Sequence, residues 1–221
     1  MSQASRPSSR STGLSDDPLE NLSAWFQLNQ KPILIAVGVV TISAAAIFGY
    51  RWMDGNKRTD ASNALYKATA PLGEGKLAET AVELQKVVQR FGGTPSGSQA
   101  AMMLGQVYYD QLKYAEGIAA LEKAKGSAGS AFEASIEALI AVGYEAQGKP
   151  EVAAQHYALA ASASKFPLDK AANQANQARN LTTAGKTAEA RKLWEELAKQ
   201  EDLPFAQEAQ VRLGELSGAG K

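Results

Sequence analysis

Residues 104–124 read LGQVYYDQLKYAEGIAALEKA, and two later segments of the chain repeat their pattern. Residues 140–160 read IAVGYEAQGKPEVAAQHYALA, and residues 177–198 read QARNLTTAGKTAEARKLWEELA. Small and large residues alternate at matched places: Gly105, Ala141 and Ala178; Tyr108, Tyr144 and Leu181; Gly117, Ala153 and Ala190; Leu121, Tyr157 and Trp194; Ala124, Ala160 and Leu197. Self-similarity with a period of about 36 residues predicts a stack of helix–turn–helix units.

A glycine followed by a lysine marks the turn inside these units. The pairs are Gly75-Lys76, Gly148-Lys149 and Gly185-Lys186. The pattern resembles the tetratricopeptide repeat, whose unit has about 34 residues, with small residues where two helices cross and large residues between units. We therefore expect an all-α fold with a tetratricopeptide-repeat-like α-solenoid over residues 58–217. A plain helical bundle is the alternative.

A second stretch, residues 32–50, reads PILIAVGVVTISAAAIFGY and contains no charged residue. About 19 residues of helix cover roughly 28 Å, which is close to the ~30 Å hydrocarbon core of a bilayer. Aromatic residues flank the stretch, as they do at the two membrane interfaces: Trp25, Phe26, Tyr50 and Trp52. We predict a transmembrane helix over residues 32–52. A buried core helix is the alternative, and a cleaved signal peptide fits the sequence poorly.

The segments before the predicted span differ from each other in composition. Residues 1–17 are rich in serine and almost free of apolar residues, which predicts a disordered tail. Residues 18–30 follow Asp17, an acidic N-cap, and have Pro18 at the first helical position. They carry apolar residues at spacings of three and four. This pattern predicts a short amphipathic helix lying in the membrane interface.

The charges on the two sides of the predicted span are nearly balanced, so they give little information on orientation. Taken alone, they slightly favour a cytoplasmic C-terminal domain. The basic residues counted are Arg6, Arg10 and Lys31 before the span and Arg51, Lys57, Arg58 and Lys67 after it.

Composition and motifs argue against two broad classes of function. With 23 Lys and Arg against 23 Asp and Glu, the chain has no net charge and lacks the basic excess of nucleic-acid-binding proteins. Cysteine is absent, which removes thiol catalysis and thiolate metal sites. The only histidine, His156, has no partner offered by spacing, and Asn180 replaces the first glycine of a phosphate loop ending at Gly185-Lys186-Thr187. We expect no catalytic, cofactor or metal site and no enzymatic activity.

The order of segments resembles the YfgM-like family, whose members are single-pass ancillary subunits of the bacterial Sec translocon. The resemblance covers roughly residues 20–215, and its most specific parts are the span with its exit segment GYRWMDGNKRTDASNALYKA and the late repeat AGKTAEARKLWEEL. It implies a bacterial inner-membrane protein with a periplasmic helical domain that contacts the translocon and a membrane-anchored periplasmic chaperone. It also implies a non-enzymatic scaffold for protein–protein interaction.

Two other functions remain open at the level of sequence. One is an accessory structural subunit of a large inner-membrane complex of the respiratory or photosynthetic type. The other is a tetratricopeptide component of cell-envelope assembly. The repeat scaffold alone does not distinguish these partners.

Two candidate interaction sites follow from the predicted helices. In a tetratricopeptide stack the first helix of each repeat lines the concave face, and the repeat register then predicts a partner groove. Its residues are Met102, Gln106, Tyr109, Asp110, Glu145, Asn176 and Arg179. In the predicted span, Thr41, Ala45 and Gly49 recur every four residues and form a small-residue stripe that lets a partner helix approach closely.

Overall fold

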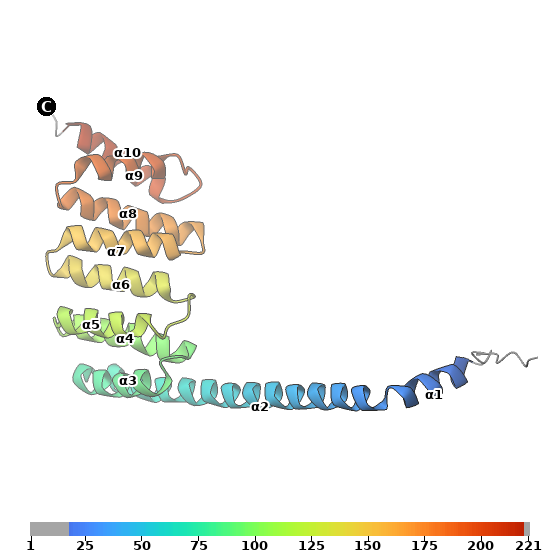
Figure 1. Ribbon diagram of the computed structural model, residues 1–221. Coiled ribbons are helices and arrows are strands. Elements are labelled where there is room, and N and C mark those ends of the chain that lie inside the picture. Colours follow the sequence, from blue (N-terminus) through green and yellow to red (C-terminus); the bar gives the residue numbers. More distant parts are fainter. Residues whose placement is uncertain (1–17, 219–221) are drawn as a thin grey trace, which may run out of the picture. The chain divides into compact units, whose positions relative to one another are not determined.

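The computed structural model describes residues 18–218, so the predicted tail, residues 1–17, lies outside the described residues. Within the described range all regular elements are helices (Figure 1). They are α1 (Pro18–Leu28), α2 (Gln30–Thr69), the short 3₁₀ helix η1 (Ala70–Glu74), α3 (Leu77–Phe91), α4 (Pro95–Asp110), α5 (Tyr114–Lys125), α6 (Glu133–Ala146), α7 (Pro150–Ala163), α8 (Pro167–Thr183), α9 (Thr187–Ala198) and α10 (Phe205–Gly218).

The chain divides into two compact units, Met1–Asp54 and Gly55–Lys221. In the first unit, helix α2 carries its large apolar side chains in exposed positions, among them Leu34, Ile42 and Phe48. None of its most apolar window of 18 residues is buried. By length and composition, α2 is therefore a candidate membrane span.

The second unit begins within α2, because this helix continues without a break to Thr69. Ala61 and Ala68 are buried in one apolar cluster with Leu84 of α3 and Leu104 of α4. The last turns of α2 therefore serve as the first helix of the first repeat, and α3 is the second.

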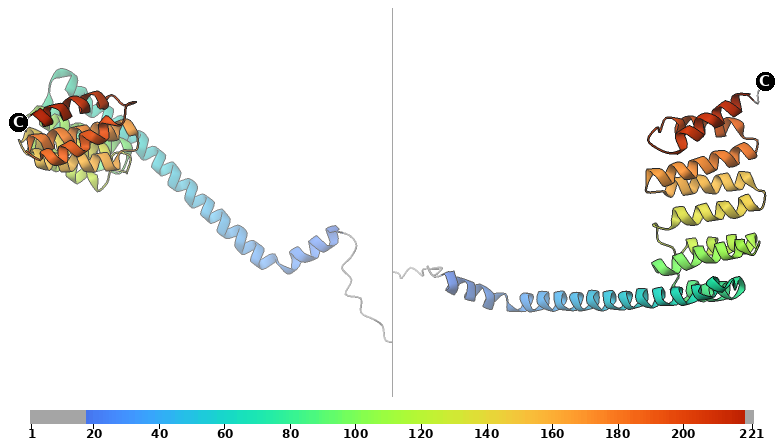
Figure 2. Two further views of the ribbon diagram at one scale, coloured as in Figure 1. Left: turned by 90° about the horizontal axis from the view of Figure 1, so that it is seen from above. Right: turned by 180° about the vertical axis from the view of Figure 1, so that it is seen from behind.

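Helices α3 to α10 stack in chain order, as Figures 1 and 2 show. Each of them packs against the next, and the first helices of neighbouring repeats also meet, α4 with α6 and α8 with α10. The predicted all-α fold with a tetratricopeptide-like solenoid is confirmed. Four helix pairs, α2–α3, α4–α5, α6–α7 and α8–α9, precede the terminal helix α10.

The core depends on close approach of helices at small side chains. Five of the small repeat positions are completely buried: Ala141, Ala153, Ala160, Ala178 and Ala190. Large residues fill the space that these short side chains leave, and the completely buried ones include Leu121, Ile136, Ile140 and Trp194. This is the dense complementary packing expected where small residues stand at helix crossings.

The turn between the two helices of each repeat has the same backbone conformation four times. Gly75, Gly148 and Gly185 have φ angles of 73°, 70° and 76°, in the left-handed region that glycine adopts without steric cost. In the second repeat this position is Leu112, with a φ of 59° and an exposed side chain. The Leu112 N–H still bonds the Tyr109 carbonyl oxygen at 2.8 Å, and the Lys113 N–H bonds that of Tyr108 at 2.8 Å. The hydrogen bonds of this helix-ending motif therefore hold a leucine in a strained conformation.

Replacing Leu112 by glycine should stabilise the protein. The left-handed region costs a non-glycine residue roughly 1–2 kcal/mol, which glycine does not pay. The greater freedom of glycine in the unfolded chain offsets part of this stabilisation. We expect Leu112→Gly to raise the free energy of unfolding by about 1 kcal/mol, a rise of roughly 2–4 °C in melting temperature by circular dichroism. The matched reverse change, Gly148→Leu, should lower it by a similar amount. A lower melting temperature for Leu112→Gly would show that the exposed leucine makes a stabilising contact.

Candidate interaction surface

The predicted groove residues lie on the first helices of three successive repeats, α4, α6 and α8. Gln106, Asp110 and Glu145 are exposed, whereas the other members of the set are partly buried. These partly buried residues are Met102, Tyr109, Asn176 and Arg179. The set therefore contains both side chains that are open to a partner and side chains that already make contacts within the protein.

The Tyr109 side chain of α4 packs against α5 and α6. A Cβ atom placed on Gly117 of α5 would lie 2.4 Å from its ring atom Cε1, and one on Gly143 of α6 would lie 2.4 Å from its hydroxyl oxygen. The hydroxyl donates a hydrogen bond to the Leu139 carbonyl oxygen at 3.0 Å, and burial raises the pKa of Tyr109. Met102 packs against the same cluster, which includes Ile118. Both residues thus join the second repeat to the third.

Glu145 of α6 accepts a hydrogen bond from α7, the second helix of its own repeat. The Tyr157 hydroxyl donates a hydrogen bond to Glu145 Oε2 at 3.1 Å. Burial raises the pKa of Tyr157, the Glu145 carboxylate raises it further, and the charge of Arg179 acts in the opposite direction. The Glu145 carboxylate nevertheless remains exposed, so it has room to accept further hydrogen bonds.

Asn176 and Arg179 belong to a polar network that joins α8 to the terminal helix α10. Arg179 Nη1 donates to the side-chain oxygen of Asn176 at 2.5 Å. Its Nε and Nη2 donate to the two carboxylate oxygens of Glu208 at 2.8 and 2.5 Å. This bidentate pair, together with the nearby charge of Arg212, holds the pKa of Glu208 below its usual range. Arg179 therefore already has a strong acidic partner.

A second charged cluster, which the sequence did not predict, joins α5, α6 and α7. Glu137 is a buried carboxylate with only 5% of its side chain exposed. Its Oε1 lies 2.5 Å from Lys125 Nζ, and its Oε2 lies 2.7 Å from His156 Nδ1. The His156 ring stacks on Tyr144, with ring centroids 5.2 Å apart. His156, which spacing in the sequence had left without a partner, thus contacts both an acid and an aromatic ring.

No spacing in the sequence reveals this pair. Glu137 lies on α6 and His156 on α7, and the packing of these two helices across the turn at residues 147–149 brings the side chains together. The hydrogen bond to Glu137 raises the pKa of Lys125, so the buried carboxylate has a charged partner. In the part of the chain that the structure describes, no group of three His, Cys, Asp or Glu could hold a metal ion. The cluster therefore ties three helices together.

The small-residue stripe lies on the exposed surface of α2. The Thr41 hydroxyl donates to the Val37 carbonyl oxygen at 2.7 Å, and Ala45 is exposed. A Cβ atom added at Gly49 would meet no atom within 4 Å. The stripe is thus open to a neighbouring helix, and its use as a contact stays a prediction.

The fold and these surfaces define a class: an all-helical repeat solenoid, in which stacked helix pairs expose an extended surface. More specifically, the chain belongs to the tetratricopeptide repeat-like domain family, because the model of that family matches residues 23–218. Such repeats typically act as protein-interaction modules without enzymatic activity. No curated protein matches the sequence.

Several solved structures of repeat proteins are similar to this chain. Two crystal structures of the nearly identical TPR-like repeats of a kinesin light chain candidate from Podosopora anserina, one of them a single-residue variant, are 18% identical. Both have a TM-score of 0.57 and match 74% of this chain and 87–88% of their own. The first TPR of Spaghetti (RPAP3), bound to an HSP90 peptide, is 22% identical with a TM-score of 0.44, over 55% of this chain and 94% of its own. The kinesin light chain likeness shows the fold.

The Arg179–Glu208 pair should stabilise the terminal helix in a pH-dependent way. Because the folded state lowers the pKa of Glu208, the pair stabilises the protein above about pH 4.5 and loses this effect as the pH falls through the lowered pKa. We expect Glu208→Gln to cost about 1 kcal/mol near neutral pH, since one bidentate ion pair is lost at a partly exposed site. The cost should shrink as the pH falls through the lowered pKa of Glu208, because wild-type Glu208 then becomes neutral itself.

Thermal unfolding followed by circular dichroism over a pH series measures this cost. Glu215→Gln is the matched control, because Glu215 is exposed and forms its ion pair with Arg212 of its own helix. It should change the melting temperature little at any pH. A Glu208→Gln deficit that is the same at both ends of the pH range would assign the effect to packing and contradict the ion-pair explanation.

Proposed function

We propose that this protein is a membrane-anchored, non-enzymatic scaffold that binds partner proteins through the first helices of its repeats. The observation that carries the proposal is helix α2. Its most apolar window of 18 residues has a mean hydropathy of 2.3 and no buried residue. The same helix continues into the tetratricopeptide-like repeats. A lipid bilayer would cover the apolar surface that the protein itself leaves exposed.

The binding surface that we propose is centred on the exposed polar side chains of α4 and α6, Gln106, Asp110 and Glu145. These three side chains are open to solvent, whereas Tyr109 and Arg179 are engaged within the protein. Truncation of a packed side chain would mix lost binding with lost stability. Gln106 and Asp110 can therefore be truncated, whereas Glu145→Gln keeps a side-chain oxygen that accepts the hydrogen bond from Tyr157.

The partner that we propose is the bacterial Sec translocon, together with a membrane-anchored periplasmic chaperone. The resemblance of the span, its exit segment and the late repeat to the YfgM-like family supports this choice. It also supports a location in the bacterial inner membrane with the repeat domain in the periplasm. The α2 span would then pass the bilayer once, with Thr41, Ala45 and Gly49 facing a translocon helix.

The topology can be tested by cysteine labelling, because the chain has no native cysteine. We expect Ser162→Cys, at an exposed position on α7, to react with a membrane-impermeant maleimide on intact spheroplasts. Ser8→Cys should react only after the cells are lysed. Labelling of Ser8→Cys alone on intact spheroplasts would contradict a periplasmic repeat domain, and labelling of neither variant after lysis would mean that the assay had failed.

The proposed surface can be tested by affinity capture of the Sec translocon from a mild-detergent extract. Loss of interface hot spots typically costs 2 kcal/mol or more, roughly thirtyfold in affinity. We expect the triple variant Gln106→Ala, Asp110→Ala and Glu145→Gln to weaken capture by about that factor, with an unchanged melting temperature. The control makes the same three kinds of change at exposed positions on α7 and α9: Gln155→Ala, Glu189→Ala and Glu195→Gln. Equal capture by both variants would exclude this surface, and no capture by the wild type would exclude the translocon.

A further inference from the structure

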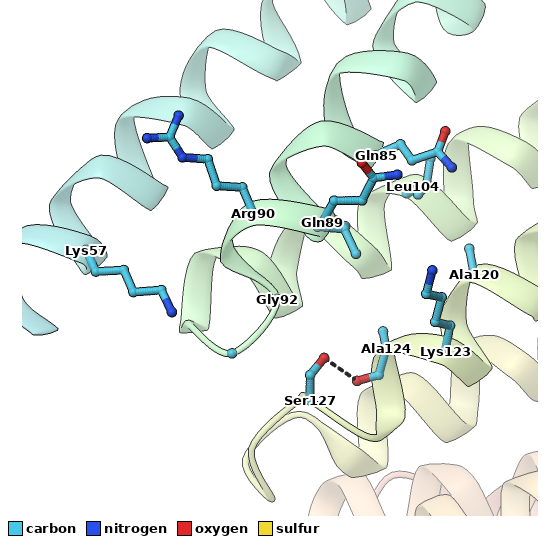
Figure 3. Close-up of a pocket in the computed structure, with 12 residues that line it drawn as sticks. Lys57, Gln85, Gln89, Arg90, Gly92, Leu104, Ala120, Lys123, Ala124 and Ser127 are labelled. Atoms are coloured by element: carbon cyan, nitrogen blue, oxygen red, sulfur yellow. Dashed lines mark hydrogen bonds between the residues drawn. The ribbon is translucent and has the colours of Figure 1, made fainter.

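A cavity of about 490 Å³ lies between the second helices of the first two repeats, α3 and α5 (Figure 3). Lys57 of α2 and the turn at Gly92 and Gly93 close its sides, and Leu104 of α4 contributes to its lining. The predicted partner groove lies on α4, α6 and α8, so this cavity is a separate site.

Three cations line the cavity, Lys57, Arg90 and Lys123, and its lining contains no aspartate or glutamate among the described residues. All three are exposed, and none of them forms an ion pair within residues 18–218. By contrast, Lys86, which lies on the same helix as Arg90, forms an ion pair with Glu83. Because the chain has no net charge, this site is a local excess of positive charge that a negatively charged ligand would neutralise.

The remaining lining combines amide groups with an apolar floor. Gln85 and Gln89 stand one helical turn apart on α3, and neither side chain has a hydrogen-bond partner among the residues described. Each amide offers both donors and an acceptor, which matches the alternating N–H and C=O groups of a polypeptide backbone. The floor contains the apolar side chains of Val88, Leu104, Ala120 and Ala124.

We propose that this cavity binds an acidic segment of a partner protein, with an apolar side chain flanked by carboxylates. The carboxylates pair with Lys57, Arg90 and Lys123, the backbone bonds the Gln85 and Gln89 amides, and the apolar side chain covers the floor. The charge favours an anion, and the floor together with the two amides favours a polypeptide over a bare phosphate group. The Arg90 guanidinium also makes a cation–π contact with the Phe91 ring, 5.0 Å from the ring centroid.

The test measures binding of fluorescent peptides to the full-length protein in detergent micelles by anisotropy. The probe is acetyl-GDELEDG-amide, and its two matched controls are GNQLQNG, without charge, and GDEGEDG, without the apolar side chain. We expect each control to bind about tenfold or more weakly than the probe, a difference of roughly 1.4 kcal/mol. Raising the salt concentration from about 50 to about 300 mM should weaken binding of the probe, since the carboxylate contacts are partly exposed.

Two variants of equal charge then assign the binding to the cavity. Lys57→Gln, Arg90→Gln and Lys123→Gln together should reduce affinity for the probe by about tenfold or more. The control variant removes three exposed lysines elsewhere: Lys113→Gln, Lys192→Gln and Lys199→Gln. It should bind as the wild type does, and both variants should keep the wild-type melting temperature.

Equal losses in the two variants would show a general effect of charge and would overturn the proposal, as would equal affinity for the probe and GNQLQNG. Displacement of the probe by inorganic phosphate, or by phosphatidylglycerol vesicles but not by phosphatidylcholine vesicles, would identify a phosphate group as the ligand and also overturn it. These outcomes are independent of the translocon capture experiment, because that experiment alters Gln106, Asp110 and Glu145 on other helices.

Discussion

The close contact of the Tyr109 ring with Gly117 and Gly143 is the constraint on which the middle of the repeat stack depends. Any side chain at either glycine would overlap the tyrosine, because an added Cβ atom would lie only 2.4 Å from it. A tyrosine at this position therefore requires glycine on both neighbouring helices, and the two glycines require a flat, large side chain to fill the space. The hydrogen bond from the Tyr109 hydroxyl to the Leu139 carbonyl oxygen then fixes α4 against α6.

Charged contacts join helices along the rest of the stack. The Glu137 cluster links α5, α6 and α7, and the Arg179–Glu208 pair links α8 to α10. A buried carboxylate is costly unless its partners are well placed, so such contacts add little net stability compared with apolar packing. They do penalise alternative arrangements, because sliding one helix along another would leave Glu137 buried without Lys125 and His156. Apolar burial thus supplies most of the stability, and the buried polar groups favour one arrangement of helices.

The fold followed from the sequence because the repeat period and the small residues at helix crossings are local patterns. The roles of single side chains could not be predicted from the sequence. Adjacent residues on a helix point about 100° apart, so the repeat register alone could not decide which of Tyr108 and Tyr109 faces the groove. Arg179 was likewise placed in the groove, and its engagement by Glu208 depends on α10, 29 residues further along the chain. The cations of the α3–α5 cavity belong to three different helices, so stacking alone brings them together and no short motif connects them.

The two proposed binding sites lie on different sets of helices of the solenoid. The exposed polar residues of α4 and α6 form the proposed partner surface, and the cationic cavity lies between α3 and α5, the second helices. Because Leu104 of α4 also contributes to the cavity lining, the two sites share one rigid helix without sharing a contact residue. Two proteins could therefore occupy the stack at once, and any coupling between them would pass through the packing of α4 against α3 and α5.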